Sequence, residues 1–112
     1  MQDCLFCKIA AGEIPSAKVY EDDRVYAFND IGPQAPVHVL IIPKKHAKDI
    51  VALSDDASLA AMFAAARKIA ADLGLSERGF RLVINTGDDG GQTVHHLHMH
   101  LLGGRFMGWP PG

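Results

Sequence analysis

The chain has 112 residues, of which 48% are hydrophobic and 21% are charged. These fractions fit one globular domain, expected to span residues 1–112, and they exclude a disordered or low-complexity chain. The 11 lysines and arginines against 13 aspartates and glutamates give a net charge of −2, so the chain has no strong positive field to hold a nucleic-acid polymer.

The N-terminal sequence lacks the basic start and apolar run of a secretory signal, and no apolar stretch approaches the ~20 residues that cross a bilayer. We therefore expect a cytoplasmic protein with no membrane partner. Cys4 and Cys7 are the only cysteines, and a reducing compartment disfavours a disulfide between them. Free thiols or a bound metal remain as interpretations of this pair.

The N-terminal third of the sequence predicts a short helix and a hairpin. Apolar residues recur at helical spacing over residues 4–11, and Gly12 follows them, which predicts a short helix that packs on the rest of the domain. Residues 17–20 and 25–28 are separated by four polar residues, and they predict two strands joined by a tight turn.

A buried strand and a long helix are expected next. Residues 37–42 are almost all apolar and end at Pro43, which is typical of a central strand covered on both faces. His38 is the polar member of this strand. Ser54 is expected to cap a helix whose apolar residues recur at helical spacing and whose end is marked by Gly74.

Two more strands complete the expected fold. Residues 80–85 alternate in polarity, and a glycine-containing loop over 86–91 separates them from a last strand over 96–102. Together the elements predict an α+β domain with a five-stranded, mainly antiparallel sheet, one long helix and one short helix.

The last strand contains an unusual concentration of histidine. Of the 6 histidines in the chain, four fall within residues 95–100. Strand alternation places His96, His98 and His100 on one face, and Leu97, Met99 and Leu101 on the other. Three imidazoles on one face would bring like charges together on protonation without a structural gain, so a function is favoured.

Two chemistries are open to these histidines: a metal site, or catalysis by imidazole as a nucleophile or acid–base. The preceding loop offers backbone N–H groups at Gly90 and Gly91 and the hydroxyl of Thr93, and such donors suit an anion such as phosphate. A zinc hydrolase would want a carboxylate nearby, and this strand has none. Phosphoryl chemistry is therefore favoured.

Residues 90–105, in which histidines alternate with hydrophobic residues, resemble the signature of the histidine triad (HIT) family. Residues 31–36, 43–46 and 109–112 are similar to its Hint branch of purine nucleoside phosphoramidate hydrolases, so the resemblance covers essentially the whole chain. It implies the HIT-like fold and a homodimer with one continuous ten-stranded sheet. It also implies hydrolysis of phosphoramidates or aminoacyl-nucleotides to nucleoside monophosphates. A nucleotide-binding regulatory or interaction module with little turnover is the alternative.

The resemblance assigns roles to four histidines and requires no cofactor for catalysis. His98 would be the nucleophile that forms a nucleotidyl-histidine. His100 would hold a phosphate oxygen, while His96 would orient its neighbours. His38 would join them as a fourth histidine that orients or relays protons. His95 stands where Hint proteins have tyrosine; it is expected on the opposite face, without a catalytic role.

The resemblance also implies a pocket for a purine nucleotide of the AMP or GMP type. Asp30 would accept hydrogen bonds from the ribose hydroxyls. The phosphate and leaving group would contact Asn85, Gly91, Thr93 and Val94. The apolar slot for the base would be formed by Leu5, Phe6, Ile9, Phe28 and Ile31, although any of these could equally be plain core. Trp109 would reach the site of the partner subunit.

The two cysteines depart from many Hint proteins, which lack them. Some bacterial members of the wider family use such a pair with two histidines to hold zinc. By that resemblance the ligands would be Cys4, Cys7, His46 and His96, a set that suits a closed structural zinc site. If zinc is bound, His96 is a ligand and not a proton carrier.

Overall fold

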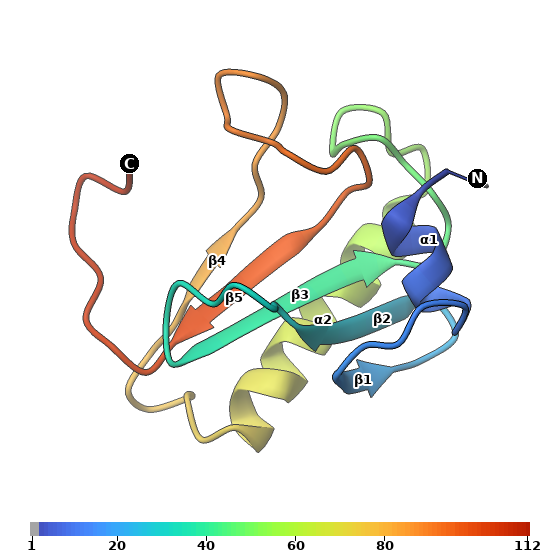
Figure 1. Cartoon of the computed structure of the whole chain (residues 1–112). Coiled ribbons are helices and arrows are strands. Elements are labelled where there is room, and N and C mark those ends of the chain that lie inside the picture. Colours follow the sequence, from blue (N-terminus) through green and yellow to red (C-terminus); the bar gives the residue numbers. More distant parts are fainter. Residues whose placement is uncertain (1–2) are drawn as a thin grey trace.

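The structure is a computed structural model that describes residues 3–112. Its five strands form one sheet in the order β1-β2-β3-β5-β4, and every neighbouring pair is antiparallel (Figure 1). The elements are α1 (Leu5–Ala10), β1 (Lys18–Glu21), β2 (Val25–Asn29), β3 (Val37–Pro43), α2 (Asp56–Asp72), β4 (Arg81–Val83) and β5 (Met99–Gly103). The expected α+β class and five-stranded sheet are confirmed.

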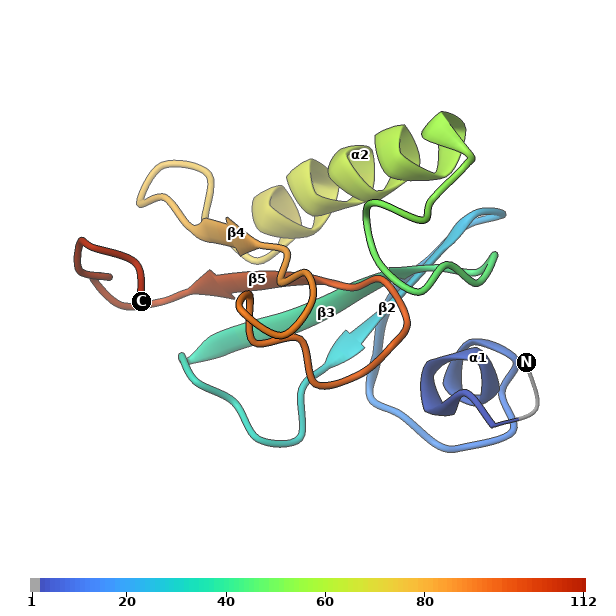
Figure 2. The same cartoon turned by 90° about the horizontal axis from the view of Figure 1, so that it is seen from above.

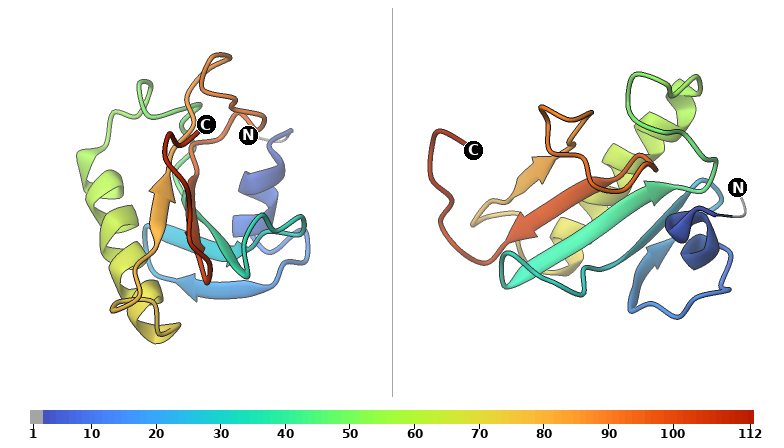
Figure 3. Two further views of the ribbon diagram at one scale, coloured as in Figure 1. Left: turned by 90° about the vertical axis from the view of Figure 1, so that its left-hand side faces the viewer. Right: turned by 45° about the horizontal axis from the view of Figure 1, so that its top comes forward.

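The two helices cover opposite faces of the sheet, as Figures 2 and 3 show. The larger core lies between α2 and the sheet, where Val39, Ile41 and Leu101 are completely buried beside the alanines of the helix. The smaller core lies under α1, where Phe6 and Ile9 pack on the other face of the central strands. The second face is the one on which polar side chains also gather.

The central strand β3 is buried on both faces, as its apolar sequence predicts. Val39 and Ile41 belong to the core under α2, whereas Leu40 and Ile42 belong to the core under α1. His38 is 6% exposed and is therefore buried at the start of this strand. Its side chain lies on the α1 side because strand residues alternate between the two faces.

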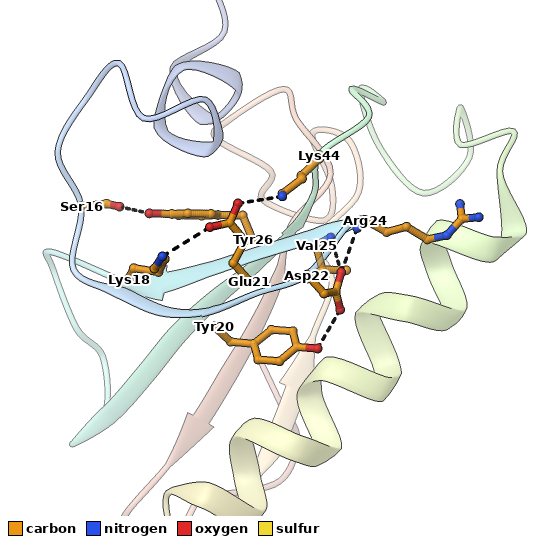
Figure 4. Close-up of polar contacts among 9 residues, drawn as sticks. All are labelled: Ser16, Lys18, Tyr20, Glu21, Asp22, Arg24, Val25, Tyr26 and Lys44. Atoms are coloured by element: carbon orange, nitrogen blue, oxygen red, sulfur yellow. Dashed lines mark hydrogen bonds and ion pairs between the residues drawn. The ribbon is translucent and has the colours of Figure 1, made fainter.

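The hairpin of β1 and β2 is closed by Asp22 (Figure 4). One carboxylate oxygen of Asp22 accepts from the backbone N–H groups of Arg24 and Val25 at 2.8 Å each. The other oxygen accepts from the hydroxyl of Tyr20 at 2.7 Å. The N–H of Asp22 also donates to the carbonyl of Val25 at 2.9 Å, so the predicted tight turn is held by the backbone and the side chain of one residue.

The start of α2 differs from the expectation, because Asp55 and not Ser54 is the N-cap. The Asp55 carboxylate accepts from the backbone N–H of Ala57 at 3.1 Å and from the hydroxyl of Ser58 at 2.7 Å. Two oxygens serve two donors at once, which a serine hydroxyl at the preceding position cannot do. The helix ends before Gly74, whose φ of 73° matches the predicted stop.

The last two strands are shorter than expected. The strand predicted over 96–102 begins at Met99, which pairs with Ile41 of β3. Continuing this register would place Leu97 opposite Pro43, and a proline has no N–H to donate. The N–H of Leu97 donates to the carbonyl of Ala47 at 2.8 Å instead. β4 ends at Val83, which pairs with His100, and continuing this register would place Asn85 opposite His98, outside β5.

None of the helices in the described part of the chain is long and apolar enough to cross a membrane.

Candidate functional site

The histidine-rich segment keeps its alternation although half of it lies outside the sheet. Leu97, Met99 and Leu101 are at most 1% exposed and belong to the core under α2. The histidines between them separate into two groups. The histidine cluster consists of His38, His98 and His100, and the Cys/His cluster consists of Cys4, Cys7, His46 and His96.

His98 is held in one tautomer by the backbone. Its Nδ1 lies 2.7 Å from the carbonyl oxygen of His96, and because a carbonyl only accepts, Nδ1 must carry the proton and donate. In the neutral ring the other nitrogen, Nε2, then has a free lone pair. The ring of Phe6 packs edge-on against the His98 imidazole with a centroid distance of 5.2 Å. His98 is thus a buried, oriented nitrogen base.

His38 and His100 form a hydrogen-bonded pair whose direction is also set by the backbone. The N–H of Gln34 donates to Nδ1 of His38 at 3.0 Å, so the proton of the neutral His38 ring is on Nε2. That atom donates to Nδ1 of His100 at 2.8 Å. The proton of His100 is therefore on its Nε2, where it forms a donor suited to a phosphate oxygen.

Burial keeps this pair neutral. Burial, together with the neighbouring His98 and His38 and against a raising effect of Asp30, lowers the pKa of His100 to about 4. Burial also lowers the pKa of His38, against a raising effect of Asp30. A carboxylate oxygen of Asp30 lies 3.5 Å from Nε2 of His38. Both rings are therefore neutral at pH 7, as the tautomers above require.

The expected apolar slot is only partly assembled. Phe6, Ile9 and Phe28 are 5–7% exposed and pack together under α1. By contrast, Leu5 is 48% exposed and Ile31 is fully exposed, so the structure does not bring these two into the apolar cluster.

The expected ribose ligand and the expected partner contact lie in different parts of the molecule. Asp30 is half-buried just after β2, and its second oxygen accepts from the N–H of Gly32 at 2.7 Å. Trp109 is 82% exposed on the C-terminal tail, which runs away from the body of the molecule (Figure 1). Asp30 therefore lies beside the histidine cluster, whereas Trp109 lies outside it.

The loop after β4 is held by a residue to which the sequence assigned no role. Gln92 is 8% exposed. Its side-chain oxygen accepts from the N–H of Gly87 at 3.0 Å, and its amide nitrogen donates to the carbonyls of Lys48 at 2.8 Å and Val94 at 3.0 Å. Every partner is a backbone group, so no pattern of side chains in the sequence could have revealed this role.

An open pocket of about 290 Å³ lies between the start of α1 and the end of this loop, lined by Asp3, Cys4, Leu5, Thr93, Val94 and His95. It brings together three of the expected nucleotide-binding residues. His95 was expected on the face opposite the triad; instead it is exposed and lines this pocket beside α1. Strand alternation does not apply to His95, because the chain bends there before β5 begins. The adjoining loop carries Asn85, which is half-buried, and Gly91, which is exposed.

The Cys/His cluster brings four ligand atoms within 4.8 Å of one another. Sulfur–nitrogen distances are 3.2 Å from Cys4 to Nδ1 of His96 and 3.4 Å from Cys7 to Nδ1 of His46. The two Nδ1 atoms are 3.1 Å apart. Around tetrahedral zinc, bonds of about 2.3 Å to sulfur and about 2.0 Å to nitrogen place the ligand atoms roughly 3.3–3.7 Å apart. The donor set therefore fits zinc in both chemistry and size.

The surroundings of the cluster also favour a cation. The Nε2–H of His96 donates to the carbonyl of Pro43 at 2.9 Å, so the lone pair of Nδ1 points into the cluster. Burial raises the pKa of the Cys7 thiol to about 11, and the hydrogen bond and charge of Cys4 act in the same direction. A cation is the ordinary means of holding such thiols as thiolates.

Comparisons with known proteins agree with this geometry. Residues 11–107 match the family described as "HIT domain". The crystal structure of a HIT family hydrolase from Legionella pneumophila Philadelphia 1 superimposes with a TM-score of 0.94 at 58% identity, covering 98% of this chain and 100% of that one. The purine nucleoside phosphoramidase of Escherichia coli K12 is 49% identical over 96% of this chain and 92% of its own. A 14 kDa zinc-binding protein of Brassica juncea is 49% identical over 98% and 100%.

Proposed function

This chain belongs to the HIT family of hydrolases, and on that premise we propose that it hydrolyses purine nucleoside phosphoramidates or aminoacyl-nucleotides and releases a nucleoside 5'-monophosphate. The observation that carries the proposal is the tautomer of His98. Its Nδ1–H donates to the carbonyl of His96, which leaves a lone pair on Nε2 next to the His100 ring, 5.0 Å away between centroids. The E. coli relative named a purine nucleoside phosphoramidase supports the substrate class.

The first step forms a covalent intermediate. The lone pair of His98 Nε2 attacks phosphorus, and the phosphorus–nitrogen bond breaks with its electron pair going to the leaving nitrogen. That nitrogen takes up one proton and departs as an amine. The Nε2–H of His100 donates to a phosphate oxygen as negative charge concentrates there.

The second step regenerates the enzyme. Water attacks the phosphorus of the nucleotidyl-histidine, the bond to His98 Nε2 breaks with its electron pair returning to that nitrogen, and the attacking water releases one proton, which balances the proton that left with the amine. The Nε2–H of His38 donates a hydrogen bond to Nδ1 of His100. This bond keeps the proton of His100 on Nε2, on the substrate side. Asp30 offsets any positive charge that gathers on this pair, since its carboxylate is 3.5 Å from His38. His96 would act through its carbonyl.

The nucleotide is proposed to lie between α1 and the loop after β4. Phe6, Ile9 and Phe28 offer the apolar surface for the purine. Contacts to the phosphate and leaving group are proposed from Asn85, Gly91, Thr93 and Val94. Asp30 is proposed to accept from the ribose as well, because one of its oxygens has no stronger bond than the 3.5 Å contact to His38.

A homodimer is proposed to complete the site. The edge strand β4 is free to pair with its copy in a ten-stranded sheet. Phe63 of α2 and Leu73 at the C-cap of this helix are 43% and 44% exposed, and we propose that they belong to the same interface. Such pairing would bury these apolar side chains. The exposed Ile31 and Trp109 would then be covered by nucleotide or by the partner subunit.

Zinc is proposed as a structural ion in the Cys/His cluster, where it would crosslink α1 to the segment around His96. The name of the Brassica juncea relative supports this ion. A cytoplasmic location is proposed, since a reducing compartment keeps both thiols available as ligands. Elemental analysis of the purified protein tests the proposal; close to one zinc per chain is expected.

The function is tested by replacing the nucleophile. His98→Asn is expected to lower the turnover of an adenosine phosphoramidate by at least about 10⁴-fold, while AMP binds within about threefold of the parent affinity. Equal turnover in variant and parent would remove His98 from the mechanism. If the parent binds AMP but turns over no phosphoramidate or acyl-adenylate, the chain is instead a nucleotide-binding regulatory module.

A further inference from the structure

The proposed nucleophile is not positioned by the sheet. His98 precedes β5, which begins at Met99, so no strand pairing fixes its backbone. The segment is attached by separate bonds, such as that from the N–H of Leu97 to the carbonyl of Ala47 at 2.8 Å and that from the Gln92 side chain to the carbonyl of Val94 at 3.0 Å. The orientation of the His98 ring must therefore come from the groups that touch it.

His96 connects the two clusters through its two ends. Its ring, which is fully buried, lies in the Cys/His cluster with Nδ1 at 3.2 Å from the Cys4 sulfur and 3.1 Å from Nδ1 of His46. Its carbonyl accepts the Nδ1–H of His98 at 2.7 Å. Any movement of the His96 ring and backbone displaces the acceptor that fixes the tautomer of His98.

Phe6 makes a second connection. It lies between Cys4 and Cys7 in the sequence, and its ring packs edge-on against both His98 at 5.2 Å and His96 at 6.0 Å. The helix that carries Phe6 has 6 residues, and so short a helix is not stable by itself. Its position depends on the apolar core under it and on the cysteines at its start.

Without a cation the Cys/His cluster is held less firmly. The lone pair of His96 Nδ1 points toward the Nδ1 of His46 and both sulfurs, because its Nε2–H is already bound to Pro43. The thiols of Cys4 and Cys7 can donate weak hydrogen bonds to the Nδ1 atoms of His96 and His46, but neither bond joins the two histidines. Removing the ion therefore replaces bonds to one centre by weak hydrogen bonds and loosens the His96 ring and the start of α1.

We infer that His96 is a positioning residue for the nucleophile, and that metal in the cluster of Cys4, Cys7, His46 and His96 sets the rate at which His98 reacts. This inference rests on the proposed function and deepens it. The ion does not touch the substrate; it fixes the carbonyl and the aromatic edge that orient the His98 ring. A metal with a purely structural role would change stability and leave the chemical step of the folded protein unchanged.

The test compares zinc-loaded protein with protein stripped by a chelator, with the zinc content of each measured. Under single-turnover conditions with an adenosine phosphoramidate, stripping is expected to slow formation of the nucleotidyl-histidine by about tenfold or more. The affinity for AMP is expected to change by less than about threefold. In ¹⁵N NMR spectra the Nδ1–H signal of His98 is expected to weaken or exchange with water, which reports the tautomer directly.

Two variants complete the test. Cys4→Ser is expected to reproduce the stripped state with zinc present. Ile69→Val, in the core under α2 on the other face of the sheet, is the control for lost stability alone, and it is expected to keep the parent rate. If Cys4→Ser does not fold, the stripped parent protein decides.

The inference is overturned by a protein that binds no zinc, or by a stripped, folded protein whose His98 signal is unchanged, whatever its rate. An unchanged single-turnover rate overturns it equally. If the zinc-loaded parent forms no nucleotidyl-histidine, the proposed function is wrong, and this result leaves the positioning role of His96 undecided. The NMR comparison then decides the positioning role of His96 without any reaction.

Discussion

His96 and His98 lie two residues apart and differ in which ring nitrogen donates a hydrogen bond to a backbone carbonyl. The carbonyl of Pro43 takes the Nε2–H of His96 and leaves Nδ1 free among sulfur and nitrogen atoms. The carbonyl of His96 takes the Nδ1–H of His98 and leaves Nε2 free beside His100. One histidine is thereby prepared as a metal ligand and the other as a nucleophile. The choice is made by backbone acceptors and not by the type of side chain.

The same contrast separates the two clusters as wholes. In the histidine cluster each contact has a donor and an acceptor, since Gln34 donates to His38 and His38 donates to His100. The cluster is thus satisfied without an ion. In the Cys/His cluster the lone pair of His96 is directed at sulfur and nitrogen atoms that are themselves metal ligands, an arrangement that suits a bound ion. Perturbing the first should change activity alone, whereas perturbing the second should change stability and metal content together with the rate.

The largest effect is expected from removing a ligand of the Cys/His cluster. His46→Ala should abolish zinc binding and lower the free energy of unfolding by about 4 kcal/mol when zinc is present at a thousandfold excess over its dissociation constant. The comparison is made by chemical denaturation of parent and variant with and without zinc. A variant that keeps its zinc and its stability would show that His46 is not a ligand.

The next effect is expected from the other cluster. His100→Ala removes the donor to the phosphate oxygen and should lower kcat by about 100-fold or more, or about 3 kcal/mol, while zinc content stays at the parent value. Lys68→Ala is the control, because Lys68 is exposed on α2, which covers the other face of the sheet; it should keep kcat within about twofold. Equal losses in both variants would mean that the histidine cluster has no special part in the reaction.

The sequence predicts which side chains face the core and which face the histidine cluster, because strand residues alternate between the two faces of a sheet. The apolar run of β3 and the positions of Leu97, Met99 and Leu101 followed from strand periodicity alone. The meeting of Cys4 and Cys7 with His46 and His96 could be expected only from the resemblance to a known family, since the two histidines are 50 residues apart.

The remainder depends on which backbone group lies next to a side chain, and this could not be predicted. The ladder stops before His98 because the register with β3 would bring Leu97 to Pro43, a fact of pairing between distant segments. The tautomers of His96 and His98 follow from that break. The cap at Asp55 in place of Ser54 has a similar cause, since the choice depends on which side chain reaches two donors at once.

A pH dependence of stability should distinguish His100 from a histidine with an ordinary pKa. Burial lowers its pKa from 6.5 to about 4 in the folded protein, so between these values the unfolded chain binds more protons. Stability is therefore complete above about pH 6.5 and is lost as the pH falls toward 4. After allowance for its partial exposure to solvent, the loss attributable to His100 is about 1–2 kcal/mol.

This loss is measured as a double difference. Denaturation of the parent and of His100→Asn at pH 7 and pH 4.5 gives the pH effect in each, and the release of zinc at low pH is common to both. The variant should lose about 1–2 kcal/mol less than the parent over this interval. The same pH effect in both proteins would show that His100 is not held neutral by its surroundings.

The smallest effect tests whether the backbone sets the direction of the histidine cluster. Gln34→Pro removes the N–H that donates to His38 Nδ1, so His38 can carry its proton on either nitrogen and no longer fixes the donor of His100. A loss of about 1 kcal/mol, or about fivefold in kcat, is expected. Gln34→Ala keeps the N–H while removing the same side chain, and it should retain the parent kcat. Equal kcat values for the two variants would show that the Gln34 N–H does not control the tautomer of His38. A loss of kcat in the proline variant alone would show that one peptide N–H sets the proton positions of both rings.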